Sequence, residues 1–149
     1  MKTLTQIAPR SPMLSRGFSL MELMVTLAII GVVAAFAVPT YQQHSLKTKR
    51  TDAYNCLTDG AQRQEEFFYN NGTYTTTLTD LGLTSNLCGE GNYTLSAAAG
   101  SSGSIASSFK LTATRRSSQT SDTRCGDLTL DNTGAKGNLN ASVAAKECW

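Results

Sequence analysis

One carboxylate is the side chain whose setting most needs a chemical explanation. Glu22 is the only charged residue in the run from Phe18 to Val38, which otherwise consists of apolar and small residues. Burying a carboxylate in such a helix costs about 3 kcal/mol on membrane-insertion scales, so Glu22 needs a partner or a function. At about 1.5 Å per residue the run forms a helix of roughly 30 Å, which is long enough to cross the hydrocarbon core of a bilayer.

Four cysteines are the next candidates for chemistry: Cys56, Cys88, Cys125 and Cys148. The chain has no Cys-x-x-Cys pair, and its only histidine, His44, has no acidic or nucleophilic motif beside it. Neither a zinc site nor a catalytic triad is therefore indicated. Four cysteines fit two disulfides in an oxidising compartment, and three pairings are possible.

One basic cluster consists of Arg115 and Arg116, with Arg124 a few residues further on, in a segment rich in Ser, Thr and Gln. Arginines in such a loop can contact phosphates, which would allow DNA binding. No aromatic residue that could stack on bases accompanies them. An ordinary solvated loop is therefore the favoured interpretation, with DNA contact as the alternative.

Asp127 and Asp131 form the one acidic pair that suggests a cation site, but the density of oxygen ligands around them is low. No glycine-rich phosphate loop follows a strand pattern. The sequence therefore predicts no catalytic residue, no metal and no cofactor, and it favours a protein that is not an enzyme.

Charge and composition indicate an extracytoplasmic domain without a bulk preference for nucleic acid. The formal net charge of +2 includes the basic residues Lys2, Arg10 and Arg16, whose removal would leave ten of the 13 basic side chains against 11 acidic ones. A nearly neutral domain gives no electrostatic argument for a nucleic-acid partner. Ser, Thr, Asn and Gly are abundant after residue 70, which suits a β-rich domain with many turns.

A polar helix from Tyr41 to Phe68 is predicted to continue the apolar one. Its apolar face, at spacings of three and four residues, consists of Leu46, Ala53, Leu57, Ala61 and Phe67 or Phe68. The opposite face, expected to be solvated, carries Lys49, Asp52, Asp59, Arg63 and Glu66. Pro39 removes one helical donor, and with Gly31 two turns earlier it predicts a break or kink between the two halves.

The remainder of the chain predicts a loop over 73–92, with a short turn around 78–83, followed by three antiparallel strands over 92–97, 107–114 and 124–131. Alternating apolar residues give each strand one buried side. The core is expected between this side of the sheet and the apolar face of the helix, which makes the fold class α+β.

The order of Gly17, Phe18 and Glu22 before a long apolar run resembles the class III signal of type IV pilins and related pseudopilins. The resemblance implies that a prepilin peptidase cleaves between Gly17 and Phe18 and that the new Phe18 amine is methylated. It also implies filaments with a core of such apolar helices, in which the carboxylate of Glu22 pairs with the N-terminal amine of a neighbouring subunit. In this family the helix between positions such as Gly31 and Pro39 can melt on entry into the filament.

The C-terminal region carries a second resemblance. Residues 125–130, residues 133–137 and the terminal Cys148-Trp149 resemble the end of minor pilins of the PilE kind. The resemblance implies the type IV pilin fold, with a disulfide between Cys125 and Cys148 that closes the C-terminal D-region. A Cys56–Cys88 bridge follows partly by elimination and partly because Cys88 ends a loop that must return to the helix. The competing set joins Cys56 to Cys125 and Cys88 to Cys148.

The resemblance implies three segments: a leader over 1–17 that is removed, a spanning and filament-core helix over 18–40, and a periplasmic or extracellular head over 41–149. The expected function is that of a structural subunit of a type IV pilus that supports adhesion, twitching motility or DNA uptake. A minor pilin is favoured over the major one. Expected partners are other pilin subunits, the prepilin peptidase and inner-membrane lipid before assembly. The alternatives are a type II secretion pseudopilin and a DNA-receptor pilin that uses Arg115 and Arg116.

Overall fold

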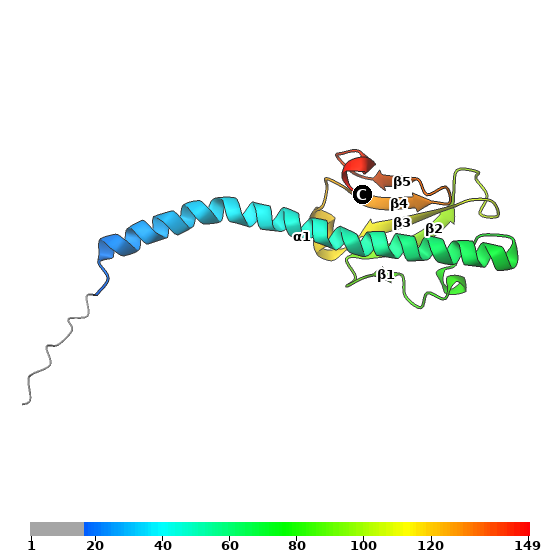
Figure 1. The fold of residues 1–149 in the computed structure, drawn as a ribbon, viewed down its shortest axis with the longest axis horizontal. Helices are drawn as coiled ribbons and strands as arrows, with labels where there is room; N and C mark the ends of the chain where they lie inside the picture. Colours follow the sequence, from blue (N-terminus) through cyan, green and yellow to red (C-terminus); the bar gives the residue numbers. More distant parts are fainter. Residues whose placement is uncertain (1–16) are drawn as a thin grey trace, which may run out of the picture. The chain divides into compact units, whose positions relative to one another are not determined.

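The computed structural model describes residues 17–149, and the rest of the expected leader lies outside the described residues. The chain divides into two compact units, one ending at Thr40 and one spanning Tyr41–Trp149. A single 52-residue helix, α1 (Leu20–Asn71), contributes to both units (Figure 1).

The first unit is the apolar part of α1. Its length and composition are those of a helix that could cross a membrane, and none of its apolar window is buried within the chain. Helical structure continues through Gly31 and Pro39, so the expected break at these two residues is absent from this structure. Proline removes only one backbone donor, and the remaining ladder of a long helix holds the segment helical. Melting on entry into a filament stays a prediction.

The second unit combines the polar half of α1 with a five-stranded antiparallel sheet in the order β1-β2-β3-β4-β5 (Figure 1). The strands are β1 (Leu87–Cys88), β2 (Tyr93–Ala99), β3 (Phe109–Arg115), β4 (Asp127–Asp131) and β5 (Lys136–Leu139). Short 3₁₀ helices lie at Leu78–Leu81, Ser117–Ser121 and Ala145–Glu147. The predicted α+β class, with one helix packed on an antiparallel sheet, is confirmed.

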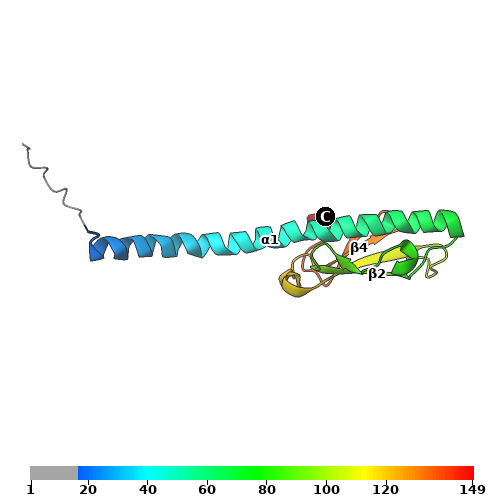
Figure 2. The ribbon, with the colours of Figure 1, turned by 90° about the horizontal axis from the view of Figure 1, so that it is seen from below.

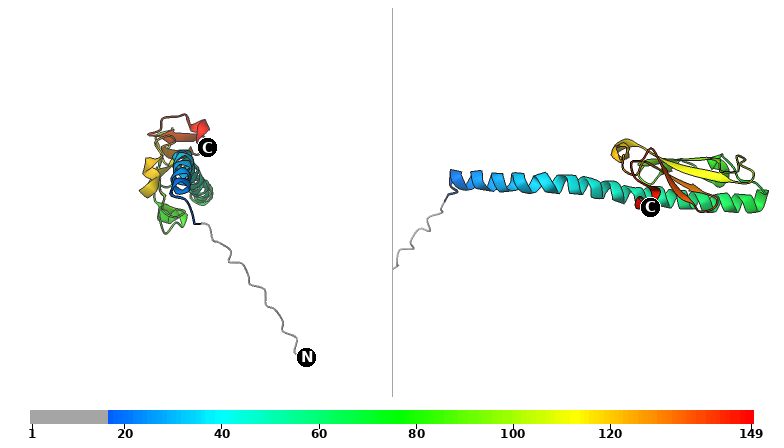
Figure 3. Two further views of the ribbon diagram at one scale, coloured as in Figure 1. Left: turned by 90° about the vertical axis from the view of Figure 1, so that its left-hand side faces the viewer. Right: turned by 90° about the horizontal axis from the view of Figure 1, so that it is seen from above.

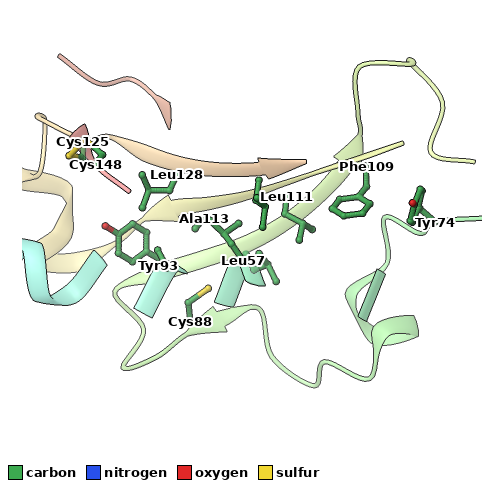
Figure 4. Packing of buried hydrophobic residues seen from close by; sticks show 13 residues of the cluster. Leu57, Tyr74, Cys88, Tyr93, Phe109, Leu111, Ala113, Cys125, Leu128 and Cys148 are labelled. Atoms are coloured by element: carbon green, nitrogen blue, oxygen red, sulfur yellow. A yellow bond between two sulfur atoms is a disulfide. The ribbon is translucent and has the colours of Figure 1, made fainter. Parts of the chain in front are cut away.

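The core lies between one face of the sheet and one stripe of α1 (Figure 4). Alternation along β3 buries Phe109, Leu111 and Ala113, as the sequence pattern predicts. Leu57 of α1 is fully buried among them. Gly60 lets the helix approach the sheet closely, since a Cβ there would lie 3.0 Å from a methyl carbon of Leu111.

Two strands were not predicted, and the boundaries of the three predicted strands shift. β1 falls within the expected loop and has only two residues, while the Lys-Gly-Asn-Leu sequence of β5 has neither alternation nor β-branched residues. Both strands form because they pair with a neighbouring strand that is already buried. The third predicted strand begins at Asp127 rather than Arg124, because Gly126 adopts a left-handed φ of 66° just before it.

Two disulfides, Cys56–Cys88 and Cys125–Cys148, close the second unit, and these are the pairs expected from the sequence. The first ties the loop after α1 back to the helix. The second ties the C-terminal segment to the turn before β4. Seen from below and from above, the C-terminus lies beside α1 (Figures 2 and 3), where the Tyr54 hydroxyl donates a hydrogen bond to the Cys148 carbonyl.

Candidate functional site

The predicted processing site precedes the helix. Gly17 and Phe18 precede α1, which begins at Leu20, and the Ser19 carbonyl accepts the first helical hydrogen bond, from the Leu23 N–H at 3.2 Å. Apart from the chain neighbours of Gly17, no atom of residues 17–149 lies within 4 Å of the position that a Gly17 Cβ would occupy, and the Phe18 side chain is 79% exposed. The peptide bond between Gly17 and Phe18 is therefore accessible backbone outside the helix, which is what a peptidase requires.

Glu22 lies in the first turn of α1 and is exposed. A carboxylate in that turn interacts favourably with the unpaired N–H groups of the helix start. Within residues 17–149 Glu22 has no ion-pair partner, so this structure leaves the predicted pairing with a neighbouring N-terminus as a prediction.

The apolar half of α1 is a continuous exposed surface. Its large apolar side chains are about half to three-quarters exposed, from Val25 at 48% to Leu20 at 76%. Nothing in the described part of the chain covers them. An exposed apolar surface of this extent marks a site of contact with a membrane or with another protein.

Two of the three arginines in the predicted basic cluster form ion pairs. Arg115 is mostly buried, and its Nε donates to Asp127 Oδ1 at 2.9 Å while its Nη1 donates to the Asp122 carbonyl at 2.7 Å. Arg124 is exposed but lies 3.1 Å from the Glu147 carboxylate. Only Arg116 is exposed without an ion pair among the described residues. Arg115 is therefore a structural residue, because contacting a phosphate would break a buried ion pair.

The acidic pair is likewise structural. Asp127 accepts hydrogen bonds from the Arg115 backbone N–H at 3.0 Å and from Asn140 at 3.1 Å. Asp131 accepts from Thr133 and from the Ala135 backbone N–H at 3.0 Å. Within residues 17–149 no cluster of His, Cys, Asp and Glu could hold a metal ion.

These hydrogen bonds also fix the charge of both carboxylates. Burial alone would raise the pKa of Asp127, but the hydrogen bonds from Arg115 and Asn140 outweigh it and hold the pKa below the usual 3.8. The hydrogen bond from the Thr133 hydroxyl lowers the pKa of Asp131.

A buried polar network beneath the β3–β4 loop was missed by the sequence reasoning. Arg50 of α1 is 6% exposed, and its Nε and Nη2 donate to the two carboxylate oxygens of Asp122 at 2.6 and 2.9 Å. Gln119 donates to the same carboxylate at 3.1 Å and to the Tyr93 hydroxyl at 2.9 Å. The network fixes the segment from Arg116 to Asp122 against the helix.

Burial raises the pKa of the Tyr93 phenol. Burial alone would lower the pKa of Arg50, but the hydrogen bond to Asp122 and the attraction of its negative charge outweigh burial and raise it. The signal for Arg50 was available, because it lies four residues after Leu46 and three before Ala53 on the buried stripe. By the same spacing Gln64 is buried, where it bonds to the backbone of Thr75. A polar residue on an apolar stripe could have been predicted to be buried with a partner.

The face of α1 expected to be solvated is only partly so. Lys49 donates to the Ser118 hydroxyl at 2.7 Å, and Asp52 accepts from Asn92 at 3.2 Å. Asp52 also fills the space beside Gly89, where a Cβ would lie 2.3 Å from its carboxyl carbon. Asp59 and Arg63, both expected on this face, form an ion pair at 2.8 Å.

The C-terminus forms a cavity of about 420 Å³ against α1. The Trp149 ring stacks on Tyr54, with the ring centroids 5.1 Å apart, and its Nε1 donates to the Gly137 carbonyl at 3.0 Å. His44 and Lys47 are exposed at the helix wall of this cavity. His44 therefore lines a cavity, where the described residues form no group that could hold a metal ion.

Comparison with known proteins agrees with this architecture. Residues 39–129 match the family described as type IV minor pilin ComP, DNA uptake sequence receptor, and residues 12–38 match the prokaryotic N-terminal methylation motif. A type IV pilin from Shewanella oneidensis has a similar structure, with a TM-score of 0.50 and 26% identity over 70% of this chain and 97% of that one.

Curated relatives point to the same class. Fimbrial protein EcpC of Eikenella corrodens is 31% identical over 98 residues, which are 65% of this chain and 64% of the relative. The type IV major pilin PilA of Myxococcus xanthus is 34% identical over 86 residues, 58% of this chain and 39% of the relative. The matched segments thus cover between about two fifths and two thirds of these relatives.

The apolar N-terminal helix, the disulfide-closed sheet and these matches define the chain as a type IV pilin. Because the family model covers more than half of its length, the chain belongs to the ComP family of type IV minor pilins.

Proposed function

We propose that this chain is a minor pilin. Before assembly it is anchored in the inner membrane with residues 41–149 in the periplasm, and it then enters the pilus. In this proposal a prepilin peptidase cuts between Gly17 and Phe18, the Phe18 amine is methylated, and other pilin subunits cover residues 18–40 in the filament. The observation that carries the proposal is the exposed apolar surface of α1, interrupted by one carboxylate at Glu22.

The carboxylate makes the proposal specific. In a filament core an opposite charge about 4 Å from Glu22 would contribute on the order of 4 kcal/mol at an effective dielectric of 20, whereas an unpaired carboxylate would be strongly unfavourable. A membrane anchor alone gains nothing from this carboxylate, which only adds to the cost of insertion. The matched motif over residues 12–38 supports processing at this position.

The test compares two carboxylates on the same helix. Glu22→Ala is expected to leave processing and membrane insertion intact but to reduce entry into sheared pili, measured by immunolabelling. Glu66→Ala, which changes an exposed carboxylate in the head, is the control and should enter pili normally. Intact mass of the membrane-bound protein reports the processing step: a mature species that does not begin at Phe18 contradicts the proposal. So does normal incorporation of Glu22→Ala.

DNA reception is the second candidate, supported by the description of the family matched over residues 39–129. Arg116 is the exposed arginine of the predicted cluster that no ion pair occupies within residues 17–149, and the 3₁₀ helix after it is held to α1 through Lys49 and Ser118. A phosphate contact at this loop would use Arg116 first. The pseudopilin alternative gains no support from the relatives reported above, which are named as fimbrial proteins or type IV pilins.

A salt titration of duplex binding tests the second candidate. Arg116→Gln is expected to weaken binding and to reduce the slope against log salt by about one, since each phosphate contact releases close to one counterion. Lys110→Gln, which removes an exposed charge on β3, is the control. Unchanged affinity and slope in Arg116→Gln would exclude this loop as a DNA contact.

A further inference from the structure

The cavity beside the C-terminus has the size and walls of a small-ligand site. One wall is α1, where His44, Lys47 and Thr51 share a face at helical spacing, and the other is the C-terminal segment that ends in Trp149. Its volume of about 420 Å³ lies in the range of small-molecule pockets. Neither the pilus-assembly surface nor the predicted arginine loop includes it.

The helix wall offers positive charge and hydrogen-bond donors. His44 and Lys47 are exposed and form no ion pair within residues 17–149. Arg50 lines the floor, and because its Nε and Nη2 hold Asp122, its remaining nitrogen Nη1 has no hydrogen bond to the described chain. The opposite wall carries Trp149 and Glu147, whose carboxylate lies 3.1 Å from Arg124. The free charge on the α1 side is therefore cationic.

The cavity also has an aromatic wall. Tyr54 and Trp149 use their polar atoms on the Cys148 and Gly137 carbonyls, and their rings stack on each other. The Lys136 ammonium lies 5.1 Å from the centroid of the Trp149 ring. Tyrosine and tryptophan beside lysine are enriched where proteins meet the polar layer of a membrane. His44 and Lys47 follow the apolar run that ends at Val38 by fewer than ten residues, roughly 15 Å of helix or less.

We propose that this cavity binds the phosphate headgroup of an anionic phospholipid while the subunit waits in the membrane. The inference rests on the proposed membrane anchoring of residues 18–40. A single phosphate group fits a site in which the Lys47 ammonium, the His44 imidazole and the Nη1 of Arg50 lie on the same wall. A DNA duplex, which presents a row of phosphates, would need a longer cationic surface than His44 and Lys47 provide. Lipid is therefore the occupant that this charge pattern favours.

Trp149 is the only tryptophan in the chain, so its fluorescence reports on the cavity directly. The mature full-length protein is reconstituted into vesicles of phosphatidylcholine, to which phosphatidylglycerol is added in steps. We expect a saturable change in Trp149 emission that pure phosphatidylcholine does not produce. Lys47→Gln should weaken the response by about five-fold, the effect of one lysine near an anionic surface. Lys110→Gln, an exposed lysine on β3 that does not line the cavity, is the control.

Each other outcome has a defined meaning. Equal responses in the two vesicle types, or an unchanged response in Lys47→Gln, overturn the proposal. Inorganic phosphate that reproduces the response at the same concentration shows a free-anion site instead of a lipid site. A short DNA duplex that competes with phosphatidylglycerol assigns the cavity to nucleic acid. Protein that fails to float with the vesicles contradicts the anchoring itself, whereas protein that floats with a silent Trp149 contradicts only the lipid site.

Discussion

Removal of Asp122 is expected to destabilise the head domain more than any surface substitution. Asp122 is 1% exposed and accepts hydrogen bonds from Arg50, from Gln119 and from the Cys125 backbone N–H at 3.3 Å. Asp122→Ala leaves the Arg50 guanidinium buried without its counter-charge. Breaking a buried pair in this way costs about 3–5 kcal/mol, a large part of the 5–15 kcal/mol that typically stabilises a domain.

The assay is urea unfolding of the fragment Tyr41–Trp149 with its disulfides intact, followed by the fluorescence of Trp149. Asp59→Ala is the matched control, because Asp59 forms an exposed pair with Arg63 that is worth at most about 0.5 kcal/mol. Replacement of both partners, Arg50→Met with Asp122→Leu, should recover most of the loss, since no buried charge then remains. A loss below about 1 kcal/mol for Asp122→Ala would refute the reasoning and show that Arg50 reaches water when its partner is removed.

Two further predictions concern acid stability and backbone geometry. The native pKa values of Asp127 and Asp131 lie below the usual 3.8, so their contribution to the free energy of unfolding is fully present above that pH. Acid titration of the head domain should show this contribution being lost as the pH falls through the lower native pKa values. A free energy of unfolding that does not change below pH 3.8 would contradict this. Gly89→Ala should destabilise more than Gly91→Ala in thermal unfolding. Both glycines have positive φ, 55° and 83°, but only at Gly89 does the new methyl group meet Asp52, so equal losses would mean that Asp52 moves freely.

The elements with regular patterns were predictable from the sequence, and those formed by tertiary pairing were not. The stripe containing Leu57 and the alternation of Phe109 and Leu111 placed helix and sheet correctly, because burial of one face leaves a period in the sequence. β5 left no such period, since it forms by pairing with β4. Its Lys-Gly-Asn-Leu sequence would suit a turn equally well.

The candidate site divides in the same way. Gly17, Phe18 and Glu22 are local signals that chain neighbours define. Which arginines are free cannot be determined locally, because the partner of Arg115 lies 12 residues away and that of Arg50 lies 72 residues away. Charge clusters in a sequence therefore overestimate free charge on a surface whenever long-range ion pairs form.

The two disulfides limit how far this subunit can be stretched. When a chain is pulled from its ends, each disulfide carries the load directly and the residues it encloses do not extend. Cys56–Cys88 and Cys125–Cys148 enclose sequence separations of 32 and 23 residues. At about 3.4 Å per residue, together they withhold nearly 190 Å from an unravelled head domain, about half of its contour length. Under tension the head domain can therefore extend by only about half of its contour length. The helix before Cys56 and the segment between Cys88 and Cys125 are the parts that can unfold and extend.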